Sequence, residues 1–562
     1  MTSGTAKTAG PADRTTGVGG PLPAGADHAP EAALRADPPS RRFLAKATLL
    51  SAALSMAGAV LGLGRDQALA HLFGAGAATD AFLVAWTVPE LAATLLIEDG
   101  MAFVLVPAFS MALARRARGH STPDPVHALI AASLPRLCLA FAAAAAATVA
   151  GAPLLVSVLA PGLPDSSLAV SCTRLTATCV LSVGLAGYCS AALRAHRSYL
   201  APGSINIAYN IAIIAAMFVL GEHWGVRSAA LGVALGGCLM VAVQTPSLVR
   251  QVAGRPGRLV SVHAADEGRP LAPGLVCAVL LFALCRQSQV LIERYFASGL
   301  PAGAISHLNY AQKVAQLPMS LSLMLCVVTF PVVAQAIAEG DSRGARDRVE
   351  RDIALIACLV LLGAAVIVAC APQIVQLLFQ RGAFTARDTA TTAAVMRVYA
   401  AGLLGQTLVG ALVRSYFAGG RTTWFPLGAM SVGALATVVI DAWAVPYWGA
   451  LGIAAANATG ITLAALLLLN GLGPASVPVR VRRVVVQLVR PVCAALCATP
   501  AGLLCAGLFA SPAASLAVCC TCVTAVFLLL AWLLDAAGAR SLLLPVMQFV
   551  RHSVTRKLGH GR

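Results

Sequence analysis

The stretches HWGVRSAALGVALGG (residues 223–237) and YWGALGIAAANATGI (residues 447–461) decide the fold of this chain. They align at a shift of 224 residues, which pairs Trp224 with Trp448. The same shift also pairs Pro107 with Pro331 and Arg197 with Arg421. One shift that holds over separated stretches indicates an internal duplication. The chain is therefore expected to contain two halves of the same architecture.

Composition identifies the medium in which these halves fold. Of 562 residues, 58% are hydrophobic and 11% are charged, and the mean hydropathy is +0.81. A soluble globular protein carries roughly 25% charged residues, so the chain is expected to be a polytopic membrane protein. Most of the 40 Lys and Arg residues lie in short gaps between apolar runs, so the net charge of +17 is a topology signal. Nucleic acid is not an expected partner.

Apolar runs of about 20 residues, the length that crosses a bilayer, occur about fourteen times. We therefore expect an all-α membrane protein with two parallel six-helix lobes and two additional C-terminal helices. The expected segments are a disordered cytoplasmic tail (1–42), an N-lobe (43–249), a basic cytoplasmic linker (250–270), a C-lobe (271–472), helices 13 and 14 (473–540) and a basic cytoplasmic tail (541–562).

Basic residues mark every second gap between the runs, as in ARRARG (114–119), RAHR (194–197) and RVRR (480–483). The alternate gaps carry few of them, although the gap around Arg381 and Arg387 is a mild exception. Because cytoplasmic loops hold the excess of Lys and Arg, both termini are expected to be cytoplasmic. This arrangement requires an even number of helices.

Six helices per half give both halves the same orientation, with an axis along the membrane normal, which is typical of alternating-access transporters. The chain is therefore expected to be a transporter and not an enzyme. The stretch GAGAA (74–78) lacks an ATP-binding pattern, so the expected energy source is an ion gradient, the membrane potential or the substrate's own gradient. No cofactor is expected. The dense group Cys519, Cys520 and Cys522 has no neighbouring His or carboxylate, so no metal site is expected there either.

Charged residues inside membrane spans are costly, and those that persist usually face a partner or a wet cavity. Arg65, Asp66, Glu293 and Arg294 lie near expected helix ends, where snorkelling or a local ion pair also explains them. Lys313 is harder to explain in this way, because the chain has four lysines and the other three lie in or beside the tails. Glu98 and Asp99 interrupt an apolar run, which is consistent either with a kink or with a gate or ion site.

Several stretches resemble the MviN/MurJ lipid II flippases, a family of the multidrug, oligosaccharidyl-lipid and polysaccharide exporter superfamily. They are VLGLGRDQALAHLFGAGAATDAFLVAWTVPEL (60–91) with VPAFS (106–110), FASGLPAGAISHLNYAQKVAQLP (296–318) and LLFQRGAFTARDT (377–389). The resemblance spans essentially all of the expected helices. It implies a cationic cavity between two lobes, a groove for a polyprenyl tail, and a bacterial cytoplasmic membrane as the location.

The resemblance also assigns candidate residues. Arg65, Asp66 and Asp80 match the family's first cavity helices, and Lys313 stands where the family usually has an arginine. The full set of expected substrate-binding residues is Arg65, Asp66, Asp80, Arg136, Arg174, Arg286 and Lys313, and the expected gate or ion-site residues are Glu98, Asp99, Glu293 and Arg294. Such cations suit the phosphates of a lipid-linked anionic glycan.

This chain departs from the family where arginines are common, since it has Ala59, Ala93 and Thr94 at those positions. Three functions therefore stay open. The first is a lipid II flippase, the second is an exporter of another polyprenyl-linked glycan or a secreted metabolite, and the third is a non-transporting scaffold in cell-wall assembly. Membrane lipids and cell-wall synthesis proteins are the expected partners beside the substrate.

Overall fold

The computed structural model describes residues 41–117, 124–253, 273–322, 342–417, 423–475, 480–507 and 509–536, and these residues form helices and no strand. The first half contains α1 (Arg41–Phe73), α2 (Ala77–Ala93), the π-helix η2 (Thr94–Asp99), α3 (Gly100–Ala117), α4 (Pro125–Ala150), α5 (Ala152–Leu159), α6 (Ser166–Ala177), α7 (Cys179–Ala195), α8 (Leu200–Trp224) and α9 (Arg227–Ala253). The second half contains α10 (Pro273–Ser298), α11 (Ala304–Ala315), α13 (Ser342–Phe379), α14 (Ala386–Phe417), α15 (Phe425–Trp448), α16 (Ala450–Ala475), α17 (Val481–Ala506) and α18 (Pro512–Leu533).

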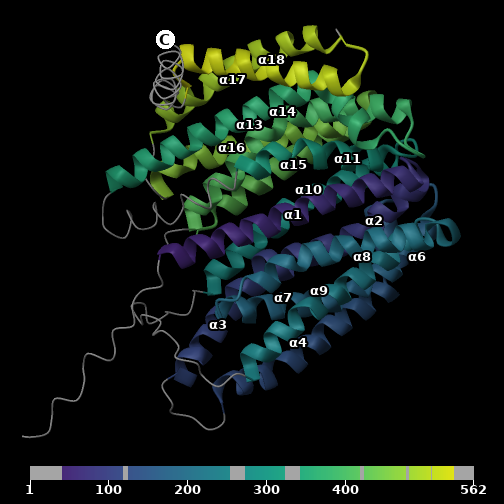
Figure 1. Ribbon diagram of the computed structural model, residues 1–562, viewed down its shortest axis with the longest axis vertical. Coiled ribbons are helices and arrows are strands. Elements are labelled where there is room, and N and C mark those ends of the chain that lie inside the picture. The colour runs from purple at the N-terminus through teal and green to yellow at the C-terminus, as the bar shows by residue number, and fades with distance from the viewer. Residues whose placement is uncertain are drawn as a thin grey trace, which may run out of the picture.

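The helix count agrees with a polytopic membrane protein of about fourteen spans. Within the described residues, 12 helical stretches are long and apolar enough to cross a membrane. The 33-residue α1 and the shorter α11 add two more helices in the places where the sequence predicts spans. The helices of each half lie side by side in Figure 1, with the first half in purple and blue and the second in green and yellow.

The duplicated stretches adopt the same turn. Gly225, between α8 and α9, has φ 56° and ψ −141°, and Gly449, between α15 and α16, has φ 53° and ψ −130°. Only glycine adopts this backbone conformation readily. The pairing of Gly225 with Gly449 in the sequence therefore reflects a shared backbone requirement.

Small residues bring neighbouring helices together. Gly232 and Gly236 lie one turn apart on α9 and face α8. A Cβ added at Gly232 would lie 2.8 Å from Ile213 Cα, and one at Gly236 would lie 2.8 Å from Tyr209 Cδ2. Because lipid tails are as apolar as the side chains, close backbone approach of this kind is a main source of helix association in membranes.

The helix bundle has two chemically different ends. All five glycines with positive φ in the described residues lie in turns at one end, which we call the glycine end: Gly74, Gly225, Gly303, Gly382 and Gly449. The opposite end carries the arginine-rich gaps and is called the basic end: Arg115, Arg116, Arg194, Arg250, Arg346, Arg351 and Arg480.

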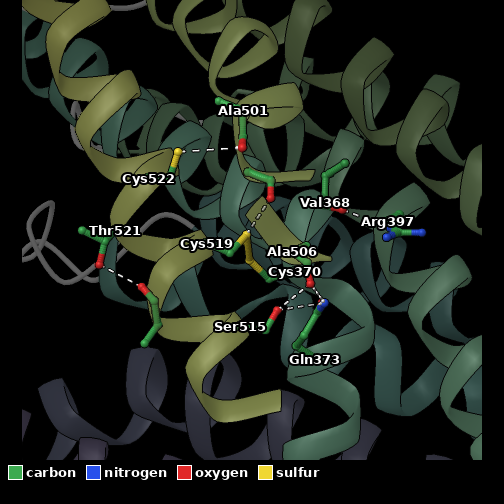
Figure 2. Close-up of a disulfide and its surroundings, with 12 residues drawn as sticks. Val368, Cys370, Gln373, Arg397, Ala501, Ala506, Ser515, Cys519, Thr521 and Cys522 are labelled. Atoms are coloured by element: carbon green, nitrogen blue, oxygen red, sulfur yellow. Dashed lines mark hydrogen bonds between the residues drawn. A yellow bond between two sulfur atoms is a disulfide. The ribbon is translucent and has the colours of Figure 1, made fainter. Parts of the chain in front are cut away.

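The last two helices are attached to the second half through α13. Figure 1 places α17 and α18 at the edge of the bundle beside α13, and a disulfide joins Cys370 of α13 to Cys519 of α18. Figure 2 shows that Gln373 lies next to this bond and donates from Nε2 to the carbonyl of Ala506 at 3.3 Å. Cys519 therefore forms a covalent connection between helices, which the sequence did not predict, whereas Cys520 and Cys522 are free thiols.

Candidate functional site

A cavity of about 560 Å³ lies in the first half, where that half meets α11 of the second half. Its wall is formed mainly by α1, α2 and η2 together with α7, α8 and α9, and Lys313 of α11 completes it from the second half. The wall extends to Arg194 and Tyr199 at the basic end. Both polar and apolar side chains line it, which suits an amphiphilic ligand.

Arg65 presents a fixed cation to this cavity. Its Nε and Nη2 donate to Asp66 Oδ1 at 3.0 and 2.7 Å, and its Nη1 donates to Asn210 Oδ1 at 3.1 Å. Asn210 is itself held by α1, because its Nδ2 donates to the carbonyl of Gly58 at 3.3 Å. A buried charge is stable only when it is paired and hydrogen-bonded, and Asp66 and Asn210 meet this condition for Arg65.

Trp86 contacts two cations of the cavity. The guanidinium carbon of Arg65 lies 4.0 Å from a ring centroid of Trp86, and Lys313 Nζ lies 5.6 Å from it. The indole Nε1 donates to the hydroxyl of Tyr209 at 3.0 Å, which fixes the ring plane. Cation–π contacts of this kind contribute about 0.5 to 2 kcal/mol each. Trp86 therefore helps to stabilise two positive charges in the same cavity.

Lys313 is also paired across the two halves. Its Nζ donates to Glu90 Oε1 at 2.9 Å, and the two side chains are 31% and 25% exposed. Glu90 lies one helical turn after Trp86 on α2, so both residues share one face. The ion pair therefore joins α2 to α11 through the cavity.

The cavity carries fewer cations than the family pattern suggests. Ala59, Ala93 and Thr94, where the resemblance leads us to expect arginines, all lie in the cavity wall. Among the described residues of the wall, the cations are Arg65, Arg194 and Lys313, and the acid is Glu90. The cavity is therefore cationic, but the carboxylate of Glu90 offsets part of its positive charge.

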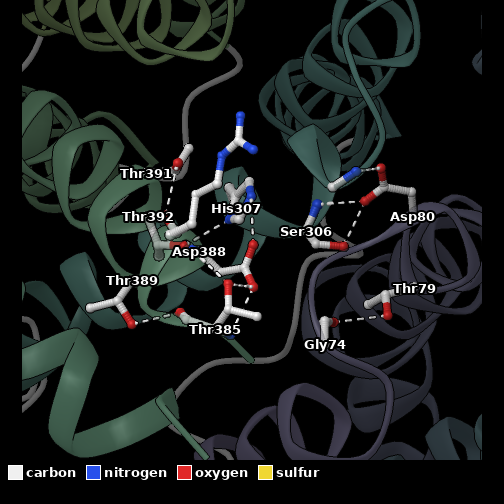
Figure 3. A network of polar contacts seen from close by, with 12 residues as sticks. Gly74, Thr79, Asp80, Ser306, His307, Thr385, Asp388, Thr389, Thr391 and Thr392 are labelled. Carbon is white, nitrogen blue, oxygen red and sulfur yellow. Dashed lines mark hydrogen bonds and ion pairs between the residues drawn. The ribbon is translucent and has the colours of Figure 1, made fainter. Parts of the chain in front are cut away.

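The glycine end of the bundle is closed by Asp80 of α2. Its Oδ2 accepts from the Gly303 amide at 2.7 Å, and its Oδ1 accepts from the amide and hydroxyl of Ser306 at 2.8 and 2.6 Å. These donors lie at the start of α11, so Asp80 caps that helix from the other half (Figure 3). The carboxylate is fully engaged in this contact and does not line the cavity.

Backbone contacts reinforce the closure. The amide of Ala383 donates to the carbonyl of His71 at 2.9 Å. A Cβ at Gly74 would lie 2.8 Å from the carbonyl oxygen of Ala383, and one at Gly303 would lie 2.6 Å from that of Ala75. Both glycines also have positive φ, so neither the space nor the backbone conformation suits a larger residue.

His307 connects the start of α11 to α14. Its Nδ1 lies 2.9 Å from Thr392 Oγ1, and its Nε2 lies 3.7 Å from Asp388 Oδ1. Asp388 in turn accepts from the amide and hydroxyl of Thr385 at 2.8 and 2.7 Å. Figure 3 shows that this network lies next to the Asp80 contact.

The other expected site residues lie in different places. Arg136 on α4 and Arg286 on α10 are exposed and do not line the cavity. Arg174 lines a second cavity at the glycine end. The side chains of Glu98 and Asp99 lie outside the described residues, although their backbone belongs to η2.

Glu293 and Arg294 are buried inside the second half, away from the cavity wall. Glu293 Oε1 accepts from Asn457 Nδ2 at 2.6 Å, and Arg294 donates to the carbonyl of Ile305 and to Asn309 Oδ1, both at 3.3 Å. These contacts join α10 to α11 and α16. Their assignment as a gate or ion site stays a prediction.

Sequence reasoning missed several residues of the cavity. Glu90, a charged residue of the second expected span, was not assigned to the site, and Trp86, Tyr209 and Asn210 were not singled out. The spacing of Trp86 and Glu90 by four residues, with Asp80 earlier on the same helix, was the available signal. The partners on α8 carry no comparable signal in the sequence.

Two similar halves, with a polar cavity where the first half meets α11 of the second and with one end closed, define a membrane transporter of the alternating-access type. The sequence profile described as "Lipid II flippase MurJ" matches residues 69–523. This chain therefore belongs to the MurJ family of lipid II flippases.

Relatives and solved structures agree with this membership. The chain is 28% identical over 446 residues to "Lipid II flippase MurJ" of Burkholderia cenocepacia, covering 76% of this chain and 84% of that protein. It is 27% identical over 443 residues to the probable lipid II flippase MurJ of Haemophilus influenzae, covering 74% and 84%.

Among solved structures, "Lipid II flippase MurJ, inward closed conformation" matches with a TM-score of 0.69 at 18% identity, covering 87% of this chain and 99% of the other. An inward-facing transporter of the multidrug resistance MATE family has a TM-score of 0.58 at 14% identity, covering 75% and 96%. At these identities the two structures support the fold alone.

Proposed function

We propose that this protein moves lipid II from the cytoplasmic to the outer leaflet of a bacterial cytoplasmic membrane by alternating access. The observation that carries the proposal is the cavity in which Arg65 and Lys313 both lie over the ring of Trp86. Lipid II has an anionic pyrophosphate head group, and guanidinium and ammonium groups in a cavity of limited solvent access bind phosphate oxygens strongly. The role is transport and not catalysis.

The orientation follows from charge. The basic end carries most of the described arginines outside the spans, and cytoplasmic loops hold the excess of Lys and Arg. We therefore assign the basic end to the cytoplasm, which places both termini there. The cavity reaches Arg194 and Tyr199 at that end, and Asp80 closes the opposite end. This state accepts substrate from the cytoplasm.

Transport in this proposal draws on an ion gradient or the membrane potential. The buried pair Glu293 and Arg294, with Asn457, is the part of the second half in which a coupling ion or proton would act. An association with cell-wall synthesis proteins is a further expectation for a transporter of this precursor.

A second candidate is an exporter of another polyprenyl-linked glycan. Ala59, Ala93 and Thr94 in the cavity wall favour it, because fewer cations suit a head group with fewer phosphate charges. The cavity is otherwise the same, so the two candidates differ in the head group and not in the mechanism.

The experiment is to deplete a bacterium of its own lipid II flippase, express this chain, and measure the lipid II accessible at the outer surface. We expect restored exposure, which Arg65→Ala and Lys313→Ala each reduce at least tenfold. Arg250→Ala, at an exposed position of the basic end, is the matched control and should restore exposure fully. No restoration by a stably inserted wild-type protein would favour the second candidate or a scaffold.

A further inference from the structure

A second cavity, of about 830 Å³, lies at the glycine end of the first half, which is the outer end in the proposed orientation. It is lined by α6, by the α8–α9 turn and by Ala78 of α2. Arg174 and Arg227 both reach it, together with His223 and the hydroxyl-bearing Ser167 and Ser171. Nothing in the transport mechanism above uses these groups.

The depth of the cavity matches the boundary between lipid and water. Trp224 in its wall is 52% exposed, and tryptophans gather at the level of the lipid head groups. Arg174 lies eight residues after the start of α6, about 12 Å deeper at 1.5 Å per residue. Its long side chain therefore has to extend toward the outer surface to keep its charge in a polar environment. Arg227 begins α9 and lies at the surface already.

The cavity is positively charged, and no carboxylate is found in its wall. Asp165, which precedes α6, is engaged by its own helix, because its Oδ1 accepts from the Leu168 amide and from Ser167 Oγ, both at 2.9 Å. These hydrogen bonds, together with the charge of Arg227, lower the pKa of Asp165 below its ordinary value. Within the described residues, neither Arg174 nor Arg227 has a hydrogen-bond or salt-bridge partner. Two helices, α6 and α9, also begin here and direct their positive ends toward the cavity.

The fold does not require these cations. In the second half, the turn between α15 and α16 has the same backbone, with Tyr447 in place of His223 and Leu451 in place of Arg227. Outer segments also tend to lack Lys and Arg. Neither the internal repeat nor the distribution of basic residues in membrane proteins accounts for two arginines in one outer cavity. A bound anionic ligand explains why they are present.

We propose that this cavity binds the phosphate group of an anionic lipid in the outer leaflet. Two guanidinium groups and the Ser171 hydroxyl supply hydrogen bonds to phosphate oxygens. The apolar side chains of Leu168, Val170 and Leu175 lie in the same wall and suit the first methylene groups of the acyl chains. Ala78 lies two residues before Asp80, so the bound lipid contacts the helix start that closes the outer end.

Native mass spectrometry of the purified full-length protein tests the proposal, with phosphatidylglycerol and phosphatidylcholine supplied in equal amounts. We expect the wild type to retain phosphatidylglycerol preferentially. In the double variant Arg174→Gln, Arg227→Gln, the preference for phosphatidylglycerol over phosphatidylcholine should be about tenfold lower. Arg387→Gln, an exposed arginine at the same end but outside the cavity, is the matched control and should keep it. An unchanged preference in the double variant would overturn the proposal.

A second variant and a competition experiment also test the proposal. Arg227→Leu places at this turn the residue that the second half already has, so it should fold normally while lowering the preference several-fold; a normal preference in this folded variant counts against the site.

Inorganic phosphate is the other probe. Because the lipid is held by its phosphate and its chains together, phosphate at millimolar concentration should displace phosphatidylglycerol only weakly. Equal binding of free phosphate would assign the cavity to a soluble ligand and overturn the lipid proposal. Neither measurement depends on transport, so the result is independent of the proposed function.

Discussion

Lys313 Nζ lies 2.9 Å from Glu90 Oε1, so the ammonium of the second half is neutralised by a carboxylate of the first. An anionic head group that enters the cavity has to compete with Glu90 for Lys313. Because the pair also joins α2 to α11, its replacement by a head group would remove a contact between the halves. In the proposed mechanism, substrate binding and the movement of the halves are linked through these two residues.

Glu90→Gln should therefore strengthen head-group binding. The amide keeps the shape of the side chain but leaves Lys313 free to bind phosphate. Both side chains are partly exposed, so we expect a modest effect, up to about tenfold in Kd, which corresponds to about 1.4 kcal/mol. Binding of lipid II to the purified protein measures it. Glu222→Gln, at an exposed position outside the cavity, is the control and should leave the Kd for lipid II unchanged. Weaker binding by Glu90→Gln would show that Glu90 orients Lys313 and does not compete for it.

Asp80→Ala should loosen the outer closure. The substitution removes the acceptor of three hydrogen bonds, and bonds to a charged group contribute about 1.5 to 3 kcal/mol each. We expect the amides of Gly303 and Ser306, which donate to this carboxylate, to exchange hydrogen at least tenfold faster. Hydrogen–deuterium exchange of the peptide that spans residues 300–310 measures this.

The control for that experiment is Asp165→Ala. Asp165 caps α6 at the same end of the bundle, and its side-chain hydrogen bonds go to Ser167 and Leu168 of α6 itself. Exchange at residues 300–310 should keep its wild-type rate in this variant. Equal acceleration by both variants would mean that the whole end frays, and that Asp80 has no special part in the closure.

The disulfide between Cys370 and Cys519 can be tested by counting the thiols that react with iodoacetamide. The chain has 16 cysteines, and this bond removes two of them from alkylation. Protein denatured without reductant should therefore take up two fewer iodoacetamide groups than reduced protein, as intact mass reports. The difference should vanish in Cys519→Ser, whose unfolding should also require about 2 kcal/mol less. Equal counts in the wild type would show that the two thiols are not bonded.

The sequence predicted the architecture well because the signals for it are local or periodic. Run length, the alternation of arginines and the Trp224 and Trp448 repeat each report on helices without any knowledge of how the helices meet. Lys313 and Arg65 were identified for a related reason, since a charge within an apolar span is conspicuous wherever it occurs.

The partners of these residues could not be predicted in the same way. Glu90 and Lys313 are 223 residues apart in the chain, and Asp80 and Gly303 are separated by the same number. Arg174 shows the second limit, because the sequence gives the depth of a residue along a span but not the face on which it lies. In spans that are apolar all round, no polar stripe identifies that face, and Arg174 lies at a different cavity from Arg65.

Gly303 offers a test of the closure by backbone geometry alone. Its φ is +96°, and an added Cβ would lie 2.6 Å from the carbonyl oxygen of Ala75 in the other half. Gly303→Ala should therefore strain the turn by about 1 to 3 kcal/mol and separate α11 from the α1–α2 turn. Gly299, in the same connection, is the matched control, because a Cβ there meets nothing closer than the Phe296 carbonyl oxygen at 3.9 Å. We expect Gly303→Ala to speed hydrogen exchange at residues 300–310 and to lower Tm, and Gly299→Ala to do neither. If both variants behave like the wild type, the two halves are not held together by this backbone contact, and the closure rests on the Asp80 carboxylate and the Ala383–His71 hydrogen bond.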